Sequence, residues 1–338
     1  MISRHIFFPE KGVVELRGEP LSPAPAPMHA RVRSEASLIS AGTELAVLHG
    51  QASHAAPPCK SGYANVGTIE KLGAGISDFA VGQRVIFGGK HADVQDFLHG
   101  ENHRWARLFA APNDLEAPDL AFVPLAAISF TAVLVCDFKP GDSVAVWGGG
   151  LIGNLAAQLF RIGGARVLLL DPNENRVELA KNCGLEAVAA SGAGAVQAVK
   201  NWTNGAGADV CVDGVGHVAV IETASQSAAN FGQIALLGSA RAPYSLDEKF
   251  FFDVHERGLT IRGAHEWRLP VVSSRENRRS VESVYGALFD FIRRELLQLA
   301  PLRSHVVSPH QAPDVYAGLR DNPAQFWGAV MDWRGSLD

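Results

Sequence analysis

The stretch Val144-Ala145-Val146-Trp147-Gly148-Gly149-Gly150-Leu151-Ile152-Gly153 decides the fold, because four apolar residues run into a glycine cluster and helical spacing follows. Gly148, Gly150 and Gly153 fit the G-x-G-x-x-G pattern. In that pattern the first glycine allows a tight turn, the second lets a pyrophosphate approach the backbone, and the third lets helix and strand pack closely. The helix N-terminus then faces the phosphates with the positive end of its dipole. The stretch predicts a dinucleotide-binding loop; an ordinary helix-opening turn is the alternative.

The acidic residue that such a loop requires is Asp171, which follows a second apolar run at 166–170. We expect its carboxylate to accept hydrogen bonds from the hydroxyl groups of the adenosine ribose and to repel a 2′-phosphate. The next residue is Pro172 rather than an arginine, so NAD is favoured over NADP. Arg176, one helical turn further on, keeps NADP open as the alternative cofactor. The alternative interpretation of Asp171 itself is an incidental surface aspartate.

The composition is that of an ordinary globular protein, with 338 residues, 47% of them hydrophobic and 19% charged, which is enough for two domains. A net charge of −5 argues against a nucleic-acid or membrane-surface partner. Four scattered cysteines and an N-terminus without an apolar signal core suit a cytoplasmic protein. The uncharged run 120–136 is short for a membrane span and predicts a buried helix.

The order of elements predicts an α/β protein. Up to about residue 120 the chain is predicted to be mostly β, with strand-like runs at 13–16, 30–33, 64–69 and 84–87. From Gly141 strands and helices alternate, which predicts a parallel doubly wound sheet. Its strands are expected at 143–147, 166–170, 208–213, 233–237 and 259–262. A last amphipathic helix around 281–291 and strands at 304–307 and 327–332 are expected to return to the first domain.

This layout resembles the medium-chain dehydrogenase/reductase superfamily over nearly the whole chain. Besides the glycine loop, the segments that carry the resemblance are Gly42-Thr43-Glu44, 62–69, 81–85, 140–144 and 259–263. The resemblance implies a GroES-like β-rich catalytic domain (1–123 and 269–338), a Rossmann domain (124–268) and a nicotinamide cleft between them. It also implies a homodimer that forms through the cofactor domain near 259–262.

The chain departs from the zinc-dependent members of that superfamily at the positions of the metal ligands. Those positions here are Ala41, Tyr63 and Ala127, and an alanine supplies no donor atom to zinc. The four-cysteine lobe of a structural zinc site is replaced by the segment 90–103. We therefore predict that the protein binds no zinc.

The same replacement segment offers one rival metal site. His99 and His103 are four residues apart, with His91, Asp93 and Glu101 nearby. Gly100 and Asn102 weaken a helix there, so solvated surface histidines are the preferred interpretation.

Without a metal, hydrogen-bond donors and a proton-transfer group must handle the substrate oxygen. Thr43, at the superfamily's substrate-side hydroxyl, is expected to relay a proton or to cap a turn. Tyr63 either presents its phenol to the substrate, with a pKa lowered by Lys60 or the nicotinamide, or fills the former metal site. Glu44 is either catalytic or orients a neighbour or the ribose. His91 acts as an acid or base, or is an ordinary loop histidine.

The remaining candidates concern the cofactor and the weaker histidines. His49 and His54 follow the catalytic segment and are less favoured. The predicted cofactor contacts, partly implied by the resemblance, are Gly148, Gly150, Leu151, Ile152, Gly153, Asp171, Thr131, Gly214, Gly238 and Ala264. Thr131 is alternatively a core helix threonine.

Together these observations predict a zinc-independent, NAD-dependent oxidoreductase that acts on a secondary alcohol or ketone of a polar, hydroxylated substrate. The segment 40–44 loosely resembles that of bacteriochlorophyllide, sugar and cyclitol dehydrogenases. A zinc-less enone or quinone reductase and a catalytically inactive NAD-binding sensor or scaffold are the alternatives.

Overall fold

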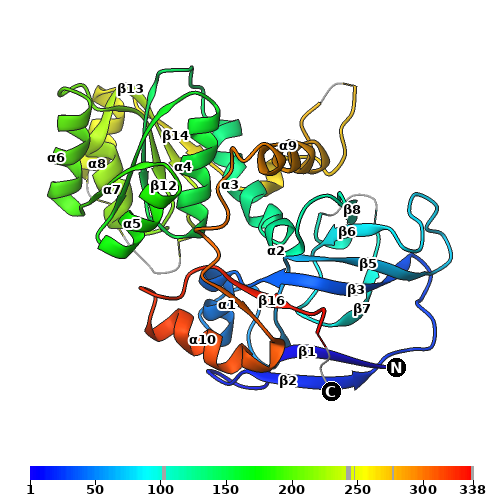
Figure 1. Cartoon of the computed structure of the whole chain (residues 1–338). Coiled ribbons are helices and arrows are strands. Elements are labelled where there is room, and N and C mark those ends of the chain that lie inside the picture. The colour runs from blue at the N-terminus through cyan, green and yellow to red at the C-terminus, as the bar shows by residue number, and fades with distance from the viewer. Residues whose placement is uncertain (101–103, 241–244, 247, 276–277, 336–338) are drawn as a thin grey trace. The chain divides into compact units, whose positions relative to one another are not determined.

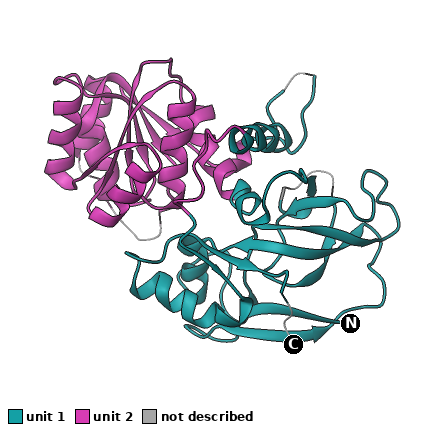
Figure 2. Ribbon diagram, in the orientation of Figure 1, with its two compact units in different colours: residues 1–124, 269–293, 303–338 teal, residues 125–268, 294–302 magenta. Residues whose placement is uncertain are grey.

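The computed structural model describes residues 1–100, 104–240, 245–246, 248–275 and 278–335. The chain divides into two compact units, shown in different colours in Figure 2. Unit 1 comprises residues 1–124, 269–293 and 303–338, and unit 2 comprises residues 125–268 and 294–302.

Unit 1 is rich in β-structure. Its strands are β1 (Ile2–Phe8), β2 (Glu15–Pro20), β3 (His29–Leu38), β4 (Cys59–Lys60), β5 (Asn65–Leu72), β6 (Arg84–Phe87), β7 (Val94–Leu98), β8 (Leu108–Ala110), β15 (His305–Val307) and β16 (Ala329–Asp332). Its helices are α1 (Ala41–Leu48), α2 (Ala117–Leu120), α9 (Val281–Arg293) and α10 (Ala312–Asp321), with 3-10 turns η1 (Arg104–Ala106) and η3 (Pro309–Gln311).

Within the described residues, these strands form two sheets. The larger has the order β15-β16-β3-β5-β6-β8, with β7 also paired to β3, and the smaller has the order β2-β1-β4. Residues from both ends of the chain share one core: Ile6 and Phe8 of β1, Val47 of α1, Tyr316 of α10 and Met331 of β16. Burying each such side chain contributes about 1.5–3 kcal/mol. This shared core holds α10 against α1 although the two helices are far apart in the sequence.

Unit 2 alternates strands and helices. Its strands are β9 (Ser143–Trp147), β10 (Arg166–Asp171), β11 (Glu186–Ala189), β12 (Ala208–Asp213), β13 (Ala228–Leu236) and β14 (Thr260–Gly263). Its helices are α3 (Val123–Val135), which starts just before the unit boundary, α4 (Leu151–Ile162), α5 (Glu174–Asn182), α6 (Gly192–Trp202), α7 (Val218–Ser227) and α8 (Glu248–Glu256), with the 3-10 turn η2 (Glu266–Arg268).

The strands of unit 2, as far as the structure describes it, lie in the order β11-β10-β9-β12-β13-β14 and pair in parallel. This is the order of a dinucleotide-binding sheet, whose connections reverse direction between β9 and β12. Figure 1 shows α4 on one side of the sheet and α6 and α7 on the other. Covered on both faces, β9 is buried along its whole length. The predicted α/β fold class, a GroES-like sheet domain and a parallel Rossmann-type sheet, is confirmed.

Several elements differ in detail from the sequence-based expectation. The strand expected at 13–16 is β2, which begins at Glu15. The helix expected at 120–136 is divided into α2 and α3, and Pro124 lies in the first turn of α3, where no intrahelical N–H bond is required. No helix within the described residues combines the length and apolarity needed to cross a bilayer.

The segment 294–302 groups with unit 2, whereas the sequence-based division placed all of 269–338 in the catalytic domain. A reciprocal pair of hydrogen bonds accounts for this difference. Gln298 N donates to Gln158 Oε1 at 2.7 Å, and Gln158 Nε2 donates to the Gln298 carbonyl at 3.1 Å. These bonds fix the segment to α4, because Gln158 is a fully buried residue of that helix.

Candidate active site

The candidate substrate-handling residues of unit 1 come from segments that meet at Gly62. Gly62 has a φ of +102°, and a Cβ added to it would lie 2.5 Å from the backbone nitrogen of His91. Only glycine permits both the conformation and this approach. His91 N can therefore donate to the Ser61 carbonyl at 2.8 Å, which brings the turn before β7 against the segment that follows β4.

The centre of this region is the carboxylate of Glu44, in the first turn of α1. Glu44 Oε1 accepts a hydrogen bond from Ser40 N at 2.7 Å. Glu44 Oε2 accepts hydrogen bonds from Ser61 Oγ and Tyr316 OH, and His91 Nε2 lies 3.0 Å from it. Four groups from four segments therefore share one carboxylate, which is only 3% exposed. Glu44 and His91 were predictable from their sequence motifs, whereas no motif signals Ser61 or Tyr316.

These contacts determine which groups carry charge. Burial alone would raise the pKa of Glu44, but the attraction of His91 and the hydrogen bonds from His91, Ser61 and Tyr316 outweigh it and hold the pKa below its ordinary value. Burial, and then the neighbouring Glu44 charge, raise the pKa of Tyr316 well above its ordinary value. Glu44 is therefore an anion and Tyr316 a neutral donor. His91 is fully buried, and its contact with Glu44 lies in the interior of unit 1.

The far side of His91 continues the network toward the C-terminus. His91 Nδ1 lies 2.7 Å from Ser37 Oγ, and Ser37 Oγ accepts a hydrogen bond from Trp333 Nε1 at 2.8 Å. Both imidazole nitrogens are thus occupied by partners within unit 1.

A second hydroxyl group lies beside this network. Tyr63 OH donates to Ser40 Oγ at 2.5 Å, and the Tyr63 ring meets the Trp105 ring edge to face at 4.9 Å between centroids. Tyr63 is half-buried and Ser40 is 7% exposed. Thr43, also half-buried, donates its backbone N–H to the Ser40 carbonyl at 3.0 Å. Ser40 therefore forms hydrogen bonds with Tyr63, Thr43 and Glu44. It was not among the residues predicted from the sequence, because a serine before a helix is ordinarily an N-cap.

Other predicted residues have different partners. Lys60, expected to act on Tyr63, forms an ion pair with Glu19. His99 Nε2 lies 3.0 Å from Asp78 Oδ2, and His99 Nδ1 accepts from Leu108 N, so its ring is already engaged. His103 and Glu101 lie outside the described residues. His49 is half-buried and His54 is exposed.

The residues at the superfamily's zinc positions do not fit a metal site. Ala41 is the first residue of α1 and Ala127 is buried in α3, and neither side chain offers a donor atom. The Tyr63 hydroxyl is hydrogen-bonded to Ser40. In the described part of the chain no group of three or more His, Cys, Asp or Glu side chains has an arrangement that would hold a metal ion.

The glycine loop of unit 2 has the geometry that a dinucleotide requires. Gly148 has a φ of +99°, and a Cβ on Gly153 would lie 1.9 Å from the Gly148 carbonyl oxygen, so both positions need glycine. A Cβ on Gly150 would meet nothing within 4 Å, which leaves the loop open on that side. Gly150 is the N-cap of α4 without a side-chain hydrogen bond, and the half-buried Leu151 and Ile152 begin the helix. The first N–H groups of α4 are therefore suited to a phosphate.

Asp171, at the end of β10, is tied to this loop. Its Oδ2 accepts from Gly149 N at 2.7 Å and its Oδ1 accepts from Asn173 N at 2.8 Å. Arg176 packs on the same loop, since a Cβ on Gly149 would lie 2.9 Å from Arg176 Cβ. Burial lowers the pKa of the Arg176 guanidinium, against the attraction of Asp171. A carboxylate and a guanidinium thus lie together at the end of β10, the position at which doubly wound folds of this type recognise an adenosine ribose.

The other predicted cofactor residues gather at the carboxyl ends of the neighbouring strands. Gly214 N donates to the Trp147 carbonyl and Gly238 N to the Asp213 carbonyl. Thr131 Oγ1 donates to the Ile128 carbonyl at 2.6 Å and to the Ala264 carbonyl at 3.2 Å. Thr131 is 1% exposed, so these bonds also satisfy its interpretation as a core helix threonine.

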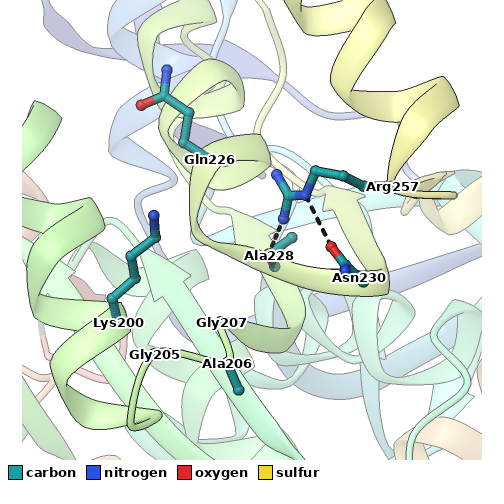
Figure 3. A pocket seen from close by; sticks show the side chains of 8 residues that line it. All are labelled: Lys200, Gly205, Ala206, Gly207, Gln226, Ala228, Asn230 and Arg257. Atoms are coloured by element: carbon teal, nitrogen blue, oxygen red, sulfur yellow. Dashed lines mark hydrogen bonds between the residues drawn. The ribbon is translucent and has the colours of Figure 1, made fainter.

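A cavity of about 510 Å³ lies elsewhere in unit 2 (Figure 3). Its lining residues are Lys200, Gly205, Ala206, Gly207, Gln226, Ala228, Asn230 and Arg257. Arg257 donates to the carbonyls of Ser225 and Ala228, and so caps the C-terminal end of α7. The cavity lies at the amino ends of β12 and β13, whereas doubly wound sheets bind ligands at the carboxyl ends. It is therefore separate from the candidate nucleotide site.

Comparisons with known proteins agree with this division. The alcohol dehydrogenase GroES-like domain model matches residues 27–110, and the zinc-binding dehydrogenase model matches residues 152–276. The chain is 25% identical over 279 residues to 2-dehydro-3-deoxy-L-galactonate 5-dehydrogenase of Pseudoalteromonas atlantica, covering 74% of this chain and 82% of that one. It is 32% identical over 164 residues to scyllo-inosose 3-dehydrogenase of Thermotoga maritima, covering 47% and 39%. The structure of galactitol-1-phosphate dehydrogenase from Escherichia coli superposes with a TM-score of 0.84 at 19% identity, covering 97% and 99%.

Proposed function

The chain belongs to the medium-chain dehydrogenase/reductase superfamily, and we propose that it is a zinc-independent, NAD-dependent dehydrogenase that interconverts a secondary alcohol and a ketone. The observations that carry the proposal are the residues Ala41, Tyr63 and Ala127 at the positions of the metal ligands and, within unit 1, the hydrogen bond of Tyr63 to Ser40. The protein is thereby an alcohol oxidoreductase in which hydroxyl groups take over the task that zinc performs as a Lewis acid.

Different residues of the chain bind the cofactor, transfer the proton and hold the backbone in place. The glycine loop and the first N–H groups of α4 hold the pyrophosphate, and Asp171 accepts the ribose hydroxyls. When bound, the nicotinamide supplies or accepts the hydride. Tyr63 donates a proton to the substrate oxygen in ketone reduction and takes one back in alcohol oxidation, with Thr43 as a second hydroxyl donor. Glu44 and His91 fix the backbone that carries these groups.

The substrate that we propose is polar and carries several hydroxyl groups. Among the relatives are dehydrogenases named for a sugar acid and for a cyclitol ketone. The candidate residues, which are hydroxyl groups rather than apolar side chains, suit the same chemistry. Hydrogen-bonding side chains reject analogues that lack a matching hydroxyl, so such a site favours a hydroxylated substrate over a simple alcohol.

NAD is the proposed cofactor because Asp171 is an anion at the ribose position and would repel a 2′-phosphate. Arg176 beside it is the feature that favours NADP.

In the same proposal the protein is a cytoplasmic homodimer. Its four cysteines are all free, and β14, with Ile261 42% exposed, ends the parallel sheet in the described residues. Light scattering on the purified protein tests the dimer, which a monomer would contradict.

Activity panels on metal-free protein test the central proposal. Protein dialysed against a chelator is assayed with NAD and a polyol panel, and with NADH or NADPH and an enone panel. Full NAD-linked polyol turnover is expected. Loss of activity on chelation with recovery on addition of zinc would refute zinc independence. Activity confined to enones with NADPH would identify an enone reductase instead, and nucleotide binding without turnover would identify a sensor.

A further inference from the structure

We infer that Ser40 is a positioning residue, which orients the Tyr63 phenol and stabilises it while Tyr63 exchanges a proton with the substrate. This inference rests on the proposed function and assigns a role to a residue outside the superfamily's metal-ligand positions. The two hydroxyl oxygens lie 2.5 Å apart, at the start of α1 and after β4.

The Ser40 side chain does not take the usual role of a serine at the start of a helix. Ser40 is the N-cap of α1, where a serine normally accepts a hydrogen bond from the backbone of the first turn, which stabilises a helix by about 1 kcal/mol. Ser40 makes no such bond. Its hydroxyl is bonded to Tyr63 instead, and its backbone N–H donates to Glu44 Oε1. Local rules are broken most often at functional sites, where another gain compensates.

The protons of the Tyr63–Ser40 pair also suit a proton-transfer role. Two hydroxyl groups in contact carry two protons, of which one lies between the oxygens and the other is left over. In the structure Tyr63 is the donor of this bond, but hydroxyl hydrogens can rotate, so Ser40 becomes the donor when Tyr63 turns its proton to the substrate. Ser40 is 7% exposed, whereas Tyr63 is half-buried, so Tyr63 is the more accessible residue of the pair. When Ser40 donates to Tyr63, the bond between the two oxygens no longer uses the Tyr63 proton.

Neighbouring contacts hold both Ser40 and Tyr63 in place. Glu44 Oε1 fixes the Ser40 backbone, and Glu44 itself is fixed by His91, Ser61 and Tyr316. The Trp105 ring edge limits rotation of the Tyr63 ring. A hydroxyl pair held this firmly loses little entropy when a substrate binds, which is the condition for efficient proton transfer.

The proton-transfer step balances as follows. In ketone reduction the carbonyl carbon accepts the hydride that a bound reduced nicotinamide would supply as it becomes oxidised, and the electron pair of the C=O π bond takes the Tyr63 proton, which yields the alcohol. The Tyr63 oxygen keeps the electron pair of its O–H bond as a phenolate, and the Ser40 hydroxyl donates a hydrogen bond to it. Water then returns a proton to Tyr63. Alcohol oxidation is the reverse.

The test compares full-length variants in steady-state assays with the best substrate from the panels. Ser40→Ala and Ser40→Gly both remove the hydroxyl, and glycine is a good N-cap, so at least one is expected to fold. We expect kcat to fall at least tenfold in each, with KM and the NADH dissociation constant within about twofold of wild type. Ser40→Thr restores the hydroxyl and is expected to stay within about threefold of wild type.

A double-mutant cycle separates positioning from an independent structural role. If Ser40 acts through Tyr63, then Ser40→Ala together with Tyr63→Phe is no slower than Tyr63→Phe alone. Ser34→Ala is the matched control. Ser34 is a 2% exposed serine of β3 whose hydroxyl has no partner in the described structure, so no change in rate is expected.

The possible outcomes distinguish this inference from the proposed function. If the wild-type protein turns over substrate and both Ser40→Ala and Ser40→Gly have the wild-type kcat, the inference is overturned and the proposed function stands. The same holds if the losses from Ser40→Ala and Tyr63→Phe multiply in the double mutant. Absence of turnover by the wild-type protein with either cofactor in every panel would overturn the proposed function, and the inference with it.

Discussion

His91 Nε2 lies 3.0 Å from Glu44 Oε2, and the two side chains are 0% and 3% exposed. The residues are 47 positions apart and belong to different segments of unit 1. Their contact places a carboxylate in an interior that would otherwise disfavour its charge. The loss of either group removes one of the contacts that compensate its partner for burial, and the hydrogen bonds from Ser61 and Tyr316 alone would then remain at Glu44 Oε2 if His91 were lost.

We predict that His91→Ala lowers the free energy of unfolding by about 3 kcal/mol or more, since Glu44 would keep its buried charge without the imidazole. Urea unfolding followed by circular dichroism measures the change. His54→Ala is the control, because His54 is exposed and should change stability by no more than about 0.5 kcal/mol. Equal effects of the two substitutions would show that the pair does not stabilise the protein.

The lowered pKa of Glu44 also predicts how the free energy of unfolding depends on pH. Its pKa is lower in the folded protein than in the unfolded chain, so its charge stabilises the fold above about pH 4.5 and this contribution is lost as pH falls through the folded pKa. Glu44→Gln keeps the shape and cannot titrate. We expect the wild type to lose stability more steeply than Glu44→Gln below about pH 4.5. Unfolding curves between pH 3 and 7 measure both slopes, and parallel slopes would contradict the prediction.

The nucleotide-binding half was predictable because its information is local. An apolar strand, a glycine loop and a helix follow one another in the sequence, and β9 and β12 have the predicted bounds. Steric demands such as that of Gly153 on the Gly148 carbonyl arise within six residues. A pattern of residue types is sufficient to encode such a structure.

The cluster around Glu44 was only partly predictable because its contacts are not local. Tyr316 lies 272 residues from Glu44 and reaches it only because α10 and α1 share a core. No periodicity in the sequence signals that pairing. The role of Ser40 was not predictable for another reason. A serine at this position suits a helix N-cap, and only the structure shows that its hydroxyl is hydrogen-bonded to Tyr63 instead.

Cofactor choice is predicted to depend on Asp171. Asp171→Asn keeps an oxygen acceptor for the backbone of Gly149 or Asn173 but removes the negative charge. We expect NAD to bind about tenfold more weakly or worse, because a hydrogen bond to a charged group contributes about 1.5–3 kcal/mol. The preference for NAD over NADP should fall by at least as much. Titration of both reduced nucleotides by fluorescence measures this, and an unchanged ratio would disprove the role of Asp171.

Arg176→Gln is the complementary variant. If Arg176 supports only a 2′-phosphate, its loss should weaken NADP binding and leave NAD binding within about twofold. Weaker binding of NAD alone would show instead that Arg176 supports the glycine loop on which it packs.

The glycine loop allows binding to be separated from folding by two alanine substitutions three residues apart. A Cβ at Gly150 meets no protein atom within 4 Å, so Gly150→Ala should melt within a few degrees of wild type. It should still lose most of its affinity for NADH, because the methyl group occupies the place where the pyrophosphate approaches the backbone. A Cβ at Gly153 would lie 1.9 Å from the Gly148 carbonyl, so Gly153→Ala should lose stability as well as affinity. Thermal melts and NADH titrations of both variants measure the two effects. If Gly150→Ala bound NADH as tightly as the wild type, the pyrophosphate would have to lie away from this loop.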